Sequence, residues 1–294
     1  MPSVTIAHAT QYQYGTEVSL GPHRIMLRPR ETRDLILTSF DLEISLEARI
    51  DWSHDVAGNA VATAQFDTNT TMLCIRSCAR VEMRAPTWPV FPIAAAAASY
   101  PFAYSPDDWT DLGVLAKPQY ADDTGRLSRW VERFVMARPT DTLSLLKDIG
   151  NGITAGISYQ SRETEGTQGP LETLDRGWGS CRDFAVLFAE AVRTLGFGAR
   201  LVSGYLFNPA ANLVGSSDAG STHAWVEVFV PGGGWIPFDP TNRSVGSSNL
   251  IPVAVARRIE QVAPVSGIFH GRPTDVLSME VSVVVEDTGV SPDW

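Results

Sequence analysis

The sequence Gly-Trp-Gly-Ser-Cys-Arg-Asp-Phe-Ala at residues 177–185 constrains the fold more than any other stretch. Apolar residues follow it at the spacing of one helix face, so a helix is predicted here. These positions are Phe184, Leu187, Phe188, Ala191 and Leu195. Ser180 is suited to cap the start of this helix, and Gly196 is suited to a left-handed cap at its end. Cys181 therefore lies in the first helical turn.

A cysteine at the start of a helix has a distinctive chemical environment. Free backbone N–H groups and the positive end of the helix dipole are close to it. Both stabilise a thiolate, which is the nucleophilic form of the side chain. Cys181 is therefore a candidate nucleophile, and a buried structural cysteine is the alternative. Gly179 allows the backbone to pass close to a substrate, and Trp178 is suited to form a wall beside it.

Two further candidates lie on a predicted antiparallel hairpin. Residues 222–230 alternate as a strand, a Pro-Gly-Gly-Gly turn follows, and residues 234–241 form the second strand. Antiparallel pairing brings His223, near the start of the first strand, to Asp239, at the end of the second. A carboxylate fixes the tautomer of a histidine, and a histidine beside a cysteine gives a thiolate–imidazolium pair. Each residue alone is readily explained by packing or a turn, but together they predict a Cys-His-Asp site.

These motifs, with Val-Ser-Gly-Tyr-Leu at residues 202–206, resemble the bacterial transglutaminase-like superfamily, whose members carry a papain-like Cys-His-Asp core. The resemblance implies that Cys181 is the nucleophile, His223 the general base and acid, and Asp239 the orienting carboxylate. Motifs outside the core are similar to the β-rich domain that precedes it in bacteria and to the segment that follows it. They are Tyr-Gln-Tyr at 12–14, His-Arg-Ile-Met-Leu-Arg-Pro at 23–29, Asp-Val-Ala-Gly-Asn at 55–59 and Val-Ala-Pro-Val-Ser-Gly at 262–267.

The resemblance and the hydrophobic pattern predict an α+β protein in three parts. Residues 1–115 are expected to form an antiparallel β-sandwich with a proline-rich linker, and residues 116–250 a papain- or transglutaminase-like core of helices packed on an antiparallel sheet. Residues 251–294 are expected to be strands that pack on the other parts and complete a sheet. Residues 42–50 alternate as one strand, and the prolines in residues 86–124 are expected to interrupt regular structure repeatedly.

A thioester-forming site needs at least two hydrogen-bond donors for its oxyanion. The backbone N–H of Cys181 is a candidate for one of them. The candidate substrate-binding or oxyanion residues are Trp178, Gly179, Tyr159, Gln160 and Trp225.

Other residues near the motifs have supporting roles. Trp225 and Trp235 are suited either to shield the site from water or to pack in the core. Asp183 is expected to cap the helix, and Glu227 to support the sheet. The Gly/Ser/Ala-rich residues 208–221 are expected to form a loop at one lip of the cleft.

The composition indicates which classes of partner and which cellular compartment to expect. The formal net charge of −10 argues against nucleic acid and membranes as partners and favours a neutral or cationic substrate. No signal peptide or membrane-spanning run is visible, so a cytoplasmic location is expected. Three cysteines give no disulfide framework. No metal or cofactor is predicted, because Cys74 and Cys78 lack a second pair of ligands nearby.

The expected chemistry is attack of a thiolate on an amide carbonyl to form a thioester. Water as the acceptor makes the enzyme a peptidase or amidase, and an amine makes it a transglutaminase. The chain has no calcium loops of the EF-hand type and no room for the two trailing β-barrels of animal transglutaminases. Hydrolysis of a peptide or isopeptide bond in a peptide or protein substrate is therefore expected first. An amine-accepting acyltransferase and a catalytically silent peptide-binding module are the alternatives.

Overall fold

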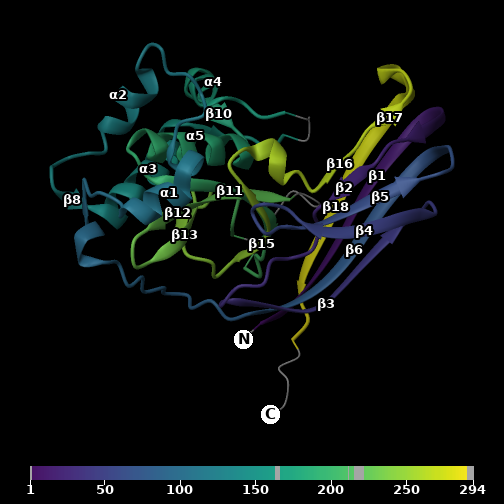
Figure 1. Ribbon diagram of the computed structural model, residues 1–294, viewed down its shortest axis with the longest axis horizontal. Helices are drawn as coiled ribbons and strands as arrows, with labels where there is room; N and C mark the ends of the chain where they lie inside the picture. Colours follow the sequence, from purple (N-terminus) through teal and green to yellow (C-terminus); the bar gives the residue numbers. More distant parts are fainter. Residues whose placement is uncertain (1, 163–165, 211, 215–221, 290–294) are drawn as a thin grey trace.

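A helix-covered core and a strand-rich region lie side by side in the computed structural model, which describes residues 2–162, 166–210, 212–214 and 222–289 (Figure 1). The strand-rich region contains two antiparallel sheets. The first has the order β17-β1-β6-β3, with β18 also paired to β1: β1 (Ser3–Leu20), β3 (Leu35–Ile44), β6 (Thr70–Met83), β17 (Phe269–His270) and β18 (Val276–Asp287). The second has the order β16-β2-β5-β4: β2 (His23–Ile25), β4 (Ala48–His54), β5 (Ala60–Phe66) and β16 (Val265–Ser266).

These two sheets pack face to face because apolar side chains alternate along their strands. Leu73 and Ile75 of β6 belong to the same buried cluster as Ala62 and Ala64 of β5. Arg76, the next residue along β6, is exposed on the outer face. The predicted N-terminal antiparallel β-sandwich is thereby confirmed.

The alternating residues 42–50 are two strands rather than the single strand predicted. β3 ends at Ile44 in the first sheet, and β4 begins at Ala48 in the second. Both strands turn their apolar side chains into the same sandwich core, so the alternation continues across the crossover. At the crossover, Ser45 binds the backbone of Cys74 through its N–H and its hydroxyl, each at 2.9 Å.

The C-terminal strand returns to the start of the chain. β18 pairs antiparallel with β1, from Val4 opposite Asp287 to Gln13 opposite Ser278. This pairing places the last described strand at an edge of the N-terminal sandwich (Figure 1). The prediction that C-terminal strands complete a sheet is confirmed.

The core is a five-stranded antiparallel sheet with helices on one face (Figure 1). Its order is β14-β13-β12-β11-β15: β11 (Gly198–Leu206), β12 (His223–Val230), β13 (Gly234–Asp239), β14 (Ser244–Val245) and β15 (Leu250–Ala256). The helices are α2 (Arg126–Glu132), α3 (Thr142–Gly156), α4 (Pro170–Arg176) and α5 (Cys181–Thr194). Alternate β12 residues pack with α5 in the main core: Ala224, Val226, Val228 and Val230. Among the described residues, no helix is long and apolar enough to cross a bilayer.

The proline-rich linker contains more regular structure than its composition predicts. It includes a short pairing of β7 (Ser99–Tyr100) with β8 (Thr140–Asp141), the helix α1 (Pro106–Leu112), and two 3₁₀ turns, η1 (Ala95–Ala97) and η2 (Gly113–Ala116). Pro106 occupies the first position of α1, where a helix does not use the missing N–H. Ser105 caps this helix by accepting a hydrogen bond from the Asp108 N–H at 3.0 Å. The prolines therefore start a helix as well as interrupt structure.

The strand-rich region covers the face of the core sheet opposite α5. Tyr205 of β11 and Ile251 of β15 share a buried cluster with Val4 and Ile6 of β1. The loop between β4 and β5 is fixed to the same face by Asn59, which is completely buried. The Asn59 amide bonds both the N–H and the C=O of Val255 in β15, at 2.9 and 2.8 Å.

We expect Asn59→Ala to lower the free energy of unfolding by about 2–6 kcal/mol. The change leaves two buried backbone groups of Val255 unpaired, and each unsatisfied group costs about 1–3 kcal/mol. Urea denaturation measures the loss. Val56→Ala is the control because Val56, in the same loop, is fully exposed. Equal urea midpoints for the two variants would show that Asn59 does not anchor the strand-rich region.

Candidate active site

The helix α5 begins at Cys181, as the sequence predicts. The Asp183 carboxylate accepts hydrogen bonds from the backbone N–H and the hydroxyl of Ser180, at 2.8 and 2.9 Å. Gly196, with φ of 91°, follows the helix in the left-handed conformation expected of a cap. Gly179 also has a packing role, and its expected place beside a substrate stays a prediction. A Cβ at Gly179 would lie 2.9 Å from the Asp183 Cβ, so the glycine allows the turn to pack on its own helix.

The hairpin brings His223 and Asp239 together. His223 Nε2 lies 2.8 Å from Asp239 Oδ2, and both side chains are completely buried. Asp239 Oδ1 accepts the N–H of Thr241 at 2.9 Å, and Oδ2 accepts the side-chain amide of Asn242 at 2.7 Å. The carboxylate is therefore held by several donors besides the imidazole.

The protonation of this pair follows from its surroundings. Burial alone would lower the pKa of His223, but the Asp239 charge and hydrogen bond, with further contributions from Cys181, raise that pKa to about 10. Burial would raise the pKa of Asp239, whereas the His223 charge and the hydrogen bonds from Asn242 and Thr241 hold it below its usual value. At neutral pH the pair is therefore an imidazolium beside a carboxylate.

Cys181 contributes to the raised pKa of the His223 imidazole. Asp239 occupies Nε2 of the imidazole, and Nδ1 is buried without a hydrogen bond of good geometry among the described residues.

The two tryptophans of the hairpin lie in different places. Trp225 stacks on His223, with 6.0 Å between the ring centres and 26° between the planes, and is only 1% exposed. It therefore covers the imidazole and has little surface for a substrate. Trp235 lies toward the turn of the hairpin, beside Phe229 and under Arg200, whose guanidinium is 4.3 Å from its ring centre. Of the two tryptophans considered as shields of the site from water, only Trp225 therefore lies against the imidazole.

Glycine in β11 makes room for Trp225. Gly204 lies opposite His223 in the antiparallel register of β11 and β12. A Cβ at Gly204 would lie 2.7 Å from the Trp225 ring and 2.1 Å from the backbone oxygen of Ile251. A side chain at this position would push Trp225 off the imidazole.

The other substrate-side candidates lie together beside the turn before Cys181. The strand β9 (Ser158–Tyr159) pairs in parallel with β10 (Trp178–Gly179). The Gln160 N–H then donates to the Gly179 C=O at 2.9 Å. The chain thus places Tyr159, Gln160 and Trp178 within one small element next to the nucleophile. Their part in oxyanion or substrate binding stays a prediction.

Sequence reasoning misses Asn242, which supports the carboxylate from the turn after β13. Its side chain donates to Asp239 and accepts the N–H of Val214 at 2.8 Å, so it links the site to the loop before His223. Its position three residues after Asp239, in a turn, is the only signal in the sequence. Of the loop expected at residues 208–221, residues 211 and 215–221 lie outside the described residues.

No group of three or more His, Cys, Asp or Glu side chains in the described residues is placed to hold a metal ion. The three cysteines are free thiols, and Cys78 is the exposed one.

Comparison with known proteins identifies two family regions. Residues 129–240 match the transglutaminase-like superfamily, and residues 4–82 match the bacterial transglutaminase-like N-terminal region. A crystal structure from Cytophaga hutchinsonii, provisionally described as a cysteine protease, has the same fold. Its TM-score is 0.74 at 21% identity, over 100% of this chain and 93% of that one.

Three relatives are similar in sequence. An uncharacterized protein of Mycobacterium leprae is 38% identical over 118 residues, so the match spans 40% of this chain and only 40% of that protein. An uncharacterized protein of Mycobacterium tuberculosis is 27% identical over 296 residues, 95% of this chain and 91% of the relative. A protein-glutamine gamma-glutamyltransferase of Pseudomonas aeruginosa is 44% identical over 73 residues, 23% of this chain and 10% of that enzyme.

Proposed function

We propose that this chain, which carries a transglutaminase-like core behind a bacterial transglutaminase-like N-terminal region, hydrolyses amide bonds of peptides or proteins through a thioester on Cys181. The observation that carries the proposal is the buried His223–Asp239 pair, whose raised histidine pKa includes a contribution from Cys181, the cysteine that opens α5. A raised histidine pKa supplies the proton that the chemistry needs.

The reaction runs in two stages. The Cys181 thiolate attacks the substrate carbonyl, and the oxyanion forms near the free backbone N–H groups of the α5 start. The His223 imidazolium gives its proton to the leaving amine, and the C–N bond breaks to leave a thioester. Neutral His223 then takes a proton from water as the water attacks the thioester. The acid leaves, and Asp239 holds the imidazole in position throughout.

Transfer to an amine is the second candidate function, and one observation favours it. A stretch of 73 residues is 44% identical to part of an enzyme described as a protein-glutamine gamma-glutamyltransferase, which supports this candidate. The two functions share the thioester and differ only in the group that attacks it. A peptide-binding module without catalysis is the third candidate.

Product analysis separates these functions. Wild type and Cys181→Ala would be incubated with a glutamine-containing peptide and an isopeptide-linked peptide, each with and without a labelled primary amine. We expect hydrolysed products from wild type only, in amounts that the amine leaves unchanged. A labelled amide adduct as the main product would instead establish transfer. Equal binding by both proteins without any product would establish a binding module.

A further inference from the structure

A buried ion pair lies behind the nucleophile and has no role in the steps above. Arg162 Nη2 donates to Asp183 Oδ1 at 2.7 Å, and the Asp183 side chain is completely buried. The same oxygen accepts the N–H of Gln168 at 2.7 Å. Because Oδ2 accepts both donors of Ser180, four hydrogen bonds meet on this carboxylate. It thus joins Arg162 and Gln168 to the turn that carries Cys181.

The charge of Asp183 is unfavourable for the chemistry. It lies two residues after Cys181, in the first turn of α5. A thiolate at Cys181 would add a second negative charge to the same helical turn, and like charges repel more strongly where water is excluded. Neutralising the carboxylate removes this repulsion.

Arg162 supplies that neutralisation. Its side chain is mostly buried, and its Nε has no hydrogen-bond partner among the described residues. A buried guanidinium with an unpaired N–H group adds little to the stability of the fold, because burial removes the water that would hydrate its charge. Arg182 donates from Nη2 to the Arg162 C=O at 3.0 Å, which ties the backbone of Arg162 to α5 as well.

The other charged groups around the turn, Arg182 included, are seen bound to partners other than Asp183. His223 and Asp239 form their own pair on the hairpin. Arg176 of α4 stacks on Trp178 and is paired with a carboxylate of its own helix, Glu172. Among the described groups, Arg162 is therefore the cation bound directly to Asp183.

We propose that Arg162 is a positioning residue of the active site: it neutralises Asp183 and so keeps the first turn of α5 able to hold a thiolate at Cys181. The inference rests on the proposed function of Cys181 as the nucleophile. It predicts that removing the charge of Arg162, and not merely its shape, makes Cys181 less reactive at neutral pH.

The test is the pH midpoint of iodoacetamide alkylation at Cys181, read by mass spectrometry. We expect Arg162→Met to raise the midpoint by about one pH unit. Arg162→Lys, which keeps the charge, is expected to stay within a few tenths of a unit of wild type. Turnover by Arg162→Met would fall about tenfold at pH 7 and recover at higher pH. The matched control is Arg24→Met, which removes the guanidinium bound to another loop-forming aspartate, Asp55, in the strand-rich region.

Each outcome decides the matter. Equal midpoints for wild type and Arg162→Met would overturn the proposal, and so would equal shifts in the Met and Lys variants, which indicate a purely structural role. A shift in Arg24→Met as large as that in Arg162→Met would attribute the effect to general loosening and also overturn it. Failure of the proposed function looks different: Cys181 of wild type would then be unreactive at neutral pH, or would not respond to loss of His223.

Discussion

Cys181→Ala is expected to lower kcat/KM for amide hydrolysis by at least about a thousandfold. The thioester cannot form without the thiol, and loss of a nucleophile in triad enzymes costs about three to six orders of magnitude. The fold should survive, because alanine fits the space of a cysteine in the main core and removes only the sulfur. A fluorogenic amide substrate measures the loss, and circular dichroism checks that the variant is folded.

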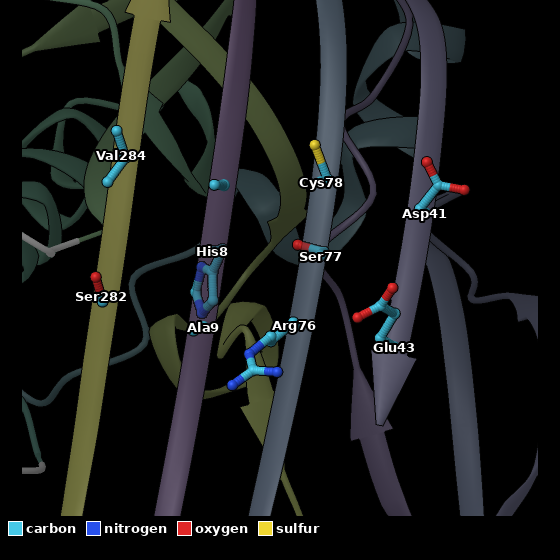
Figure 2. A pocket seen from close by; sticks show the side chains of 10 residues that line it. His8, Ala9, Asp41, Glu43, Arg76, Ser77, Cys78, Ser282 and Val284 are labelled. Carbon is cyan, nitrogen blue, oxygen red and sulfur yellow. The ribbon is translucent and has the colours of Figure 1, made fainter. Parts of the chain in front are cut away.

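Cys78→Ala is the matched control for this change. Cys78 is exposed on the outer face of the N-terminal sheet, in a recess of about 270 Å³ that it shares with Arg76 and Glu43 (Figure 2). Its removal should leave turnover unchanged. If Cys181→Ala retained turnover within tenfold of wild type, the thioester mechanism would be refuted.

Asp239→Asn is expected to lower kcat/KM at pH 8 by about a hundredfold and to move the alkaline limb of the pH profile to lower pH. The Asp239 charge is the main reason that the pKa of His223 rises to about 10. Asparagine keeps the shape and one acceptor but removes the charge, so the imidazolium loses its proton at lower pH. The measurement is kcat/KM between pH 5 and 11 for both proteins.

The same pair makes stability depend on pH in a defined direction. The pKa of His223 is higher in the folded protein than the value of about 6.5 in the unfolded chain, so the folded state binds the proton more tightly. Its contribution to stability is complete below pH 6.5 and is lost as the pH rises through about 10. Asp239→Asn should flatten this decline. The control is Asp175→Asn on the exposed surface of α4. If the alkaline limb of the kcat/KM profile lay at the same pH in Asp239→Asn as in wild type, the assignment of that limb to His223 would be contradicted.

The sequence predicts the parts of the site that depend on local signals. Cys181 follows a capping serine, and the hairpin is marked by alternation and a glycine turn, so antiparallel geometry alone brings His223 to Asp239. Spacing along the chain therefore carries most of the information about these residues.

The parts that sequence reasoning misses depend on tertiary contacts. Arg162 meets Asp183 from 21 residues away, and nothing in its neighbourhood marks that partner. Trp235 has the same strand pattern as Trp225, and only the register shows that it lies away from the imidazole. The sequence pattern does not reveal the crossover near Ser45, because β3 and β4 turn their apolar side chains into the same core.

The strand-rich region contributes to the site from behind the core sheet. Trp225 stacks on His223 and belongs to a buried cluster in which Ala57, from the loop between β4 and β5, also packs. Asn59 fixes that loop to Val255 of the same cluster. The N-terminal region therefore packs behind Trp225, which covers the imidazole of His223.

The central claim is that Cys181 and His223 form a thiolate–imidazolium pair. The most direct test is the rate of iodoacetamide alkylation at Cys181 between pH 4 and 10, in wild type and in His223→Ala. Mass spectrometry separates Cys181 from Cys74 and from the exposed Cys78. We predict fast alkylation of wild-type Cys181 well below pH 8, and loss of this low-pH reactivity in His223→Ala. Identical pH profiles for Cys181 in the two proteins would contradict the claim.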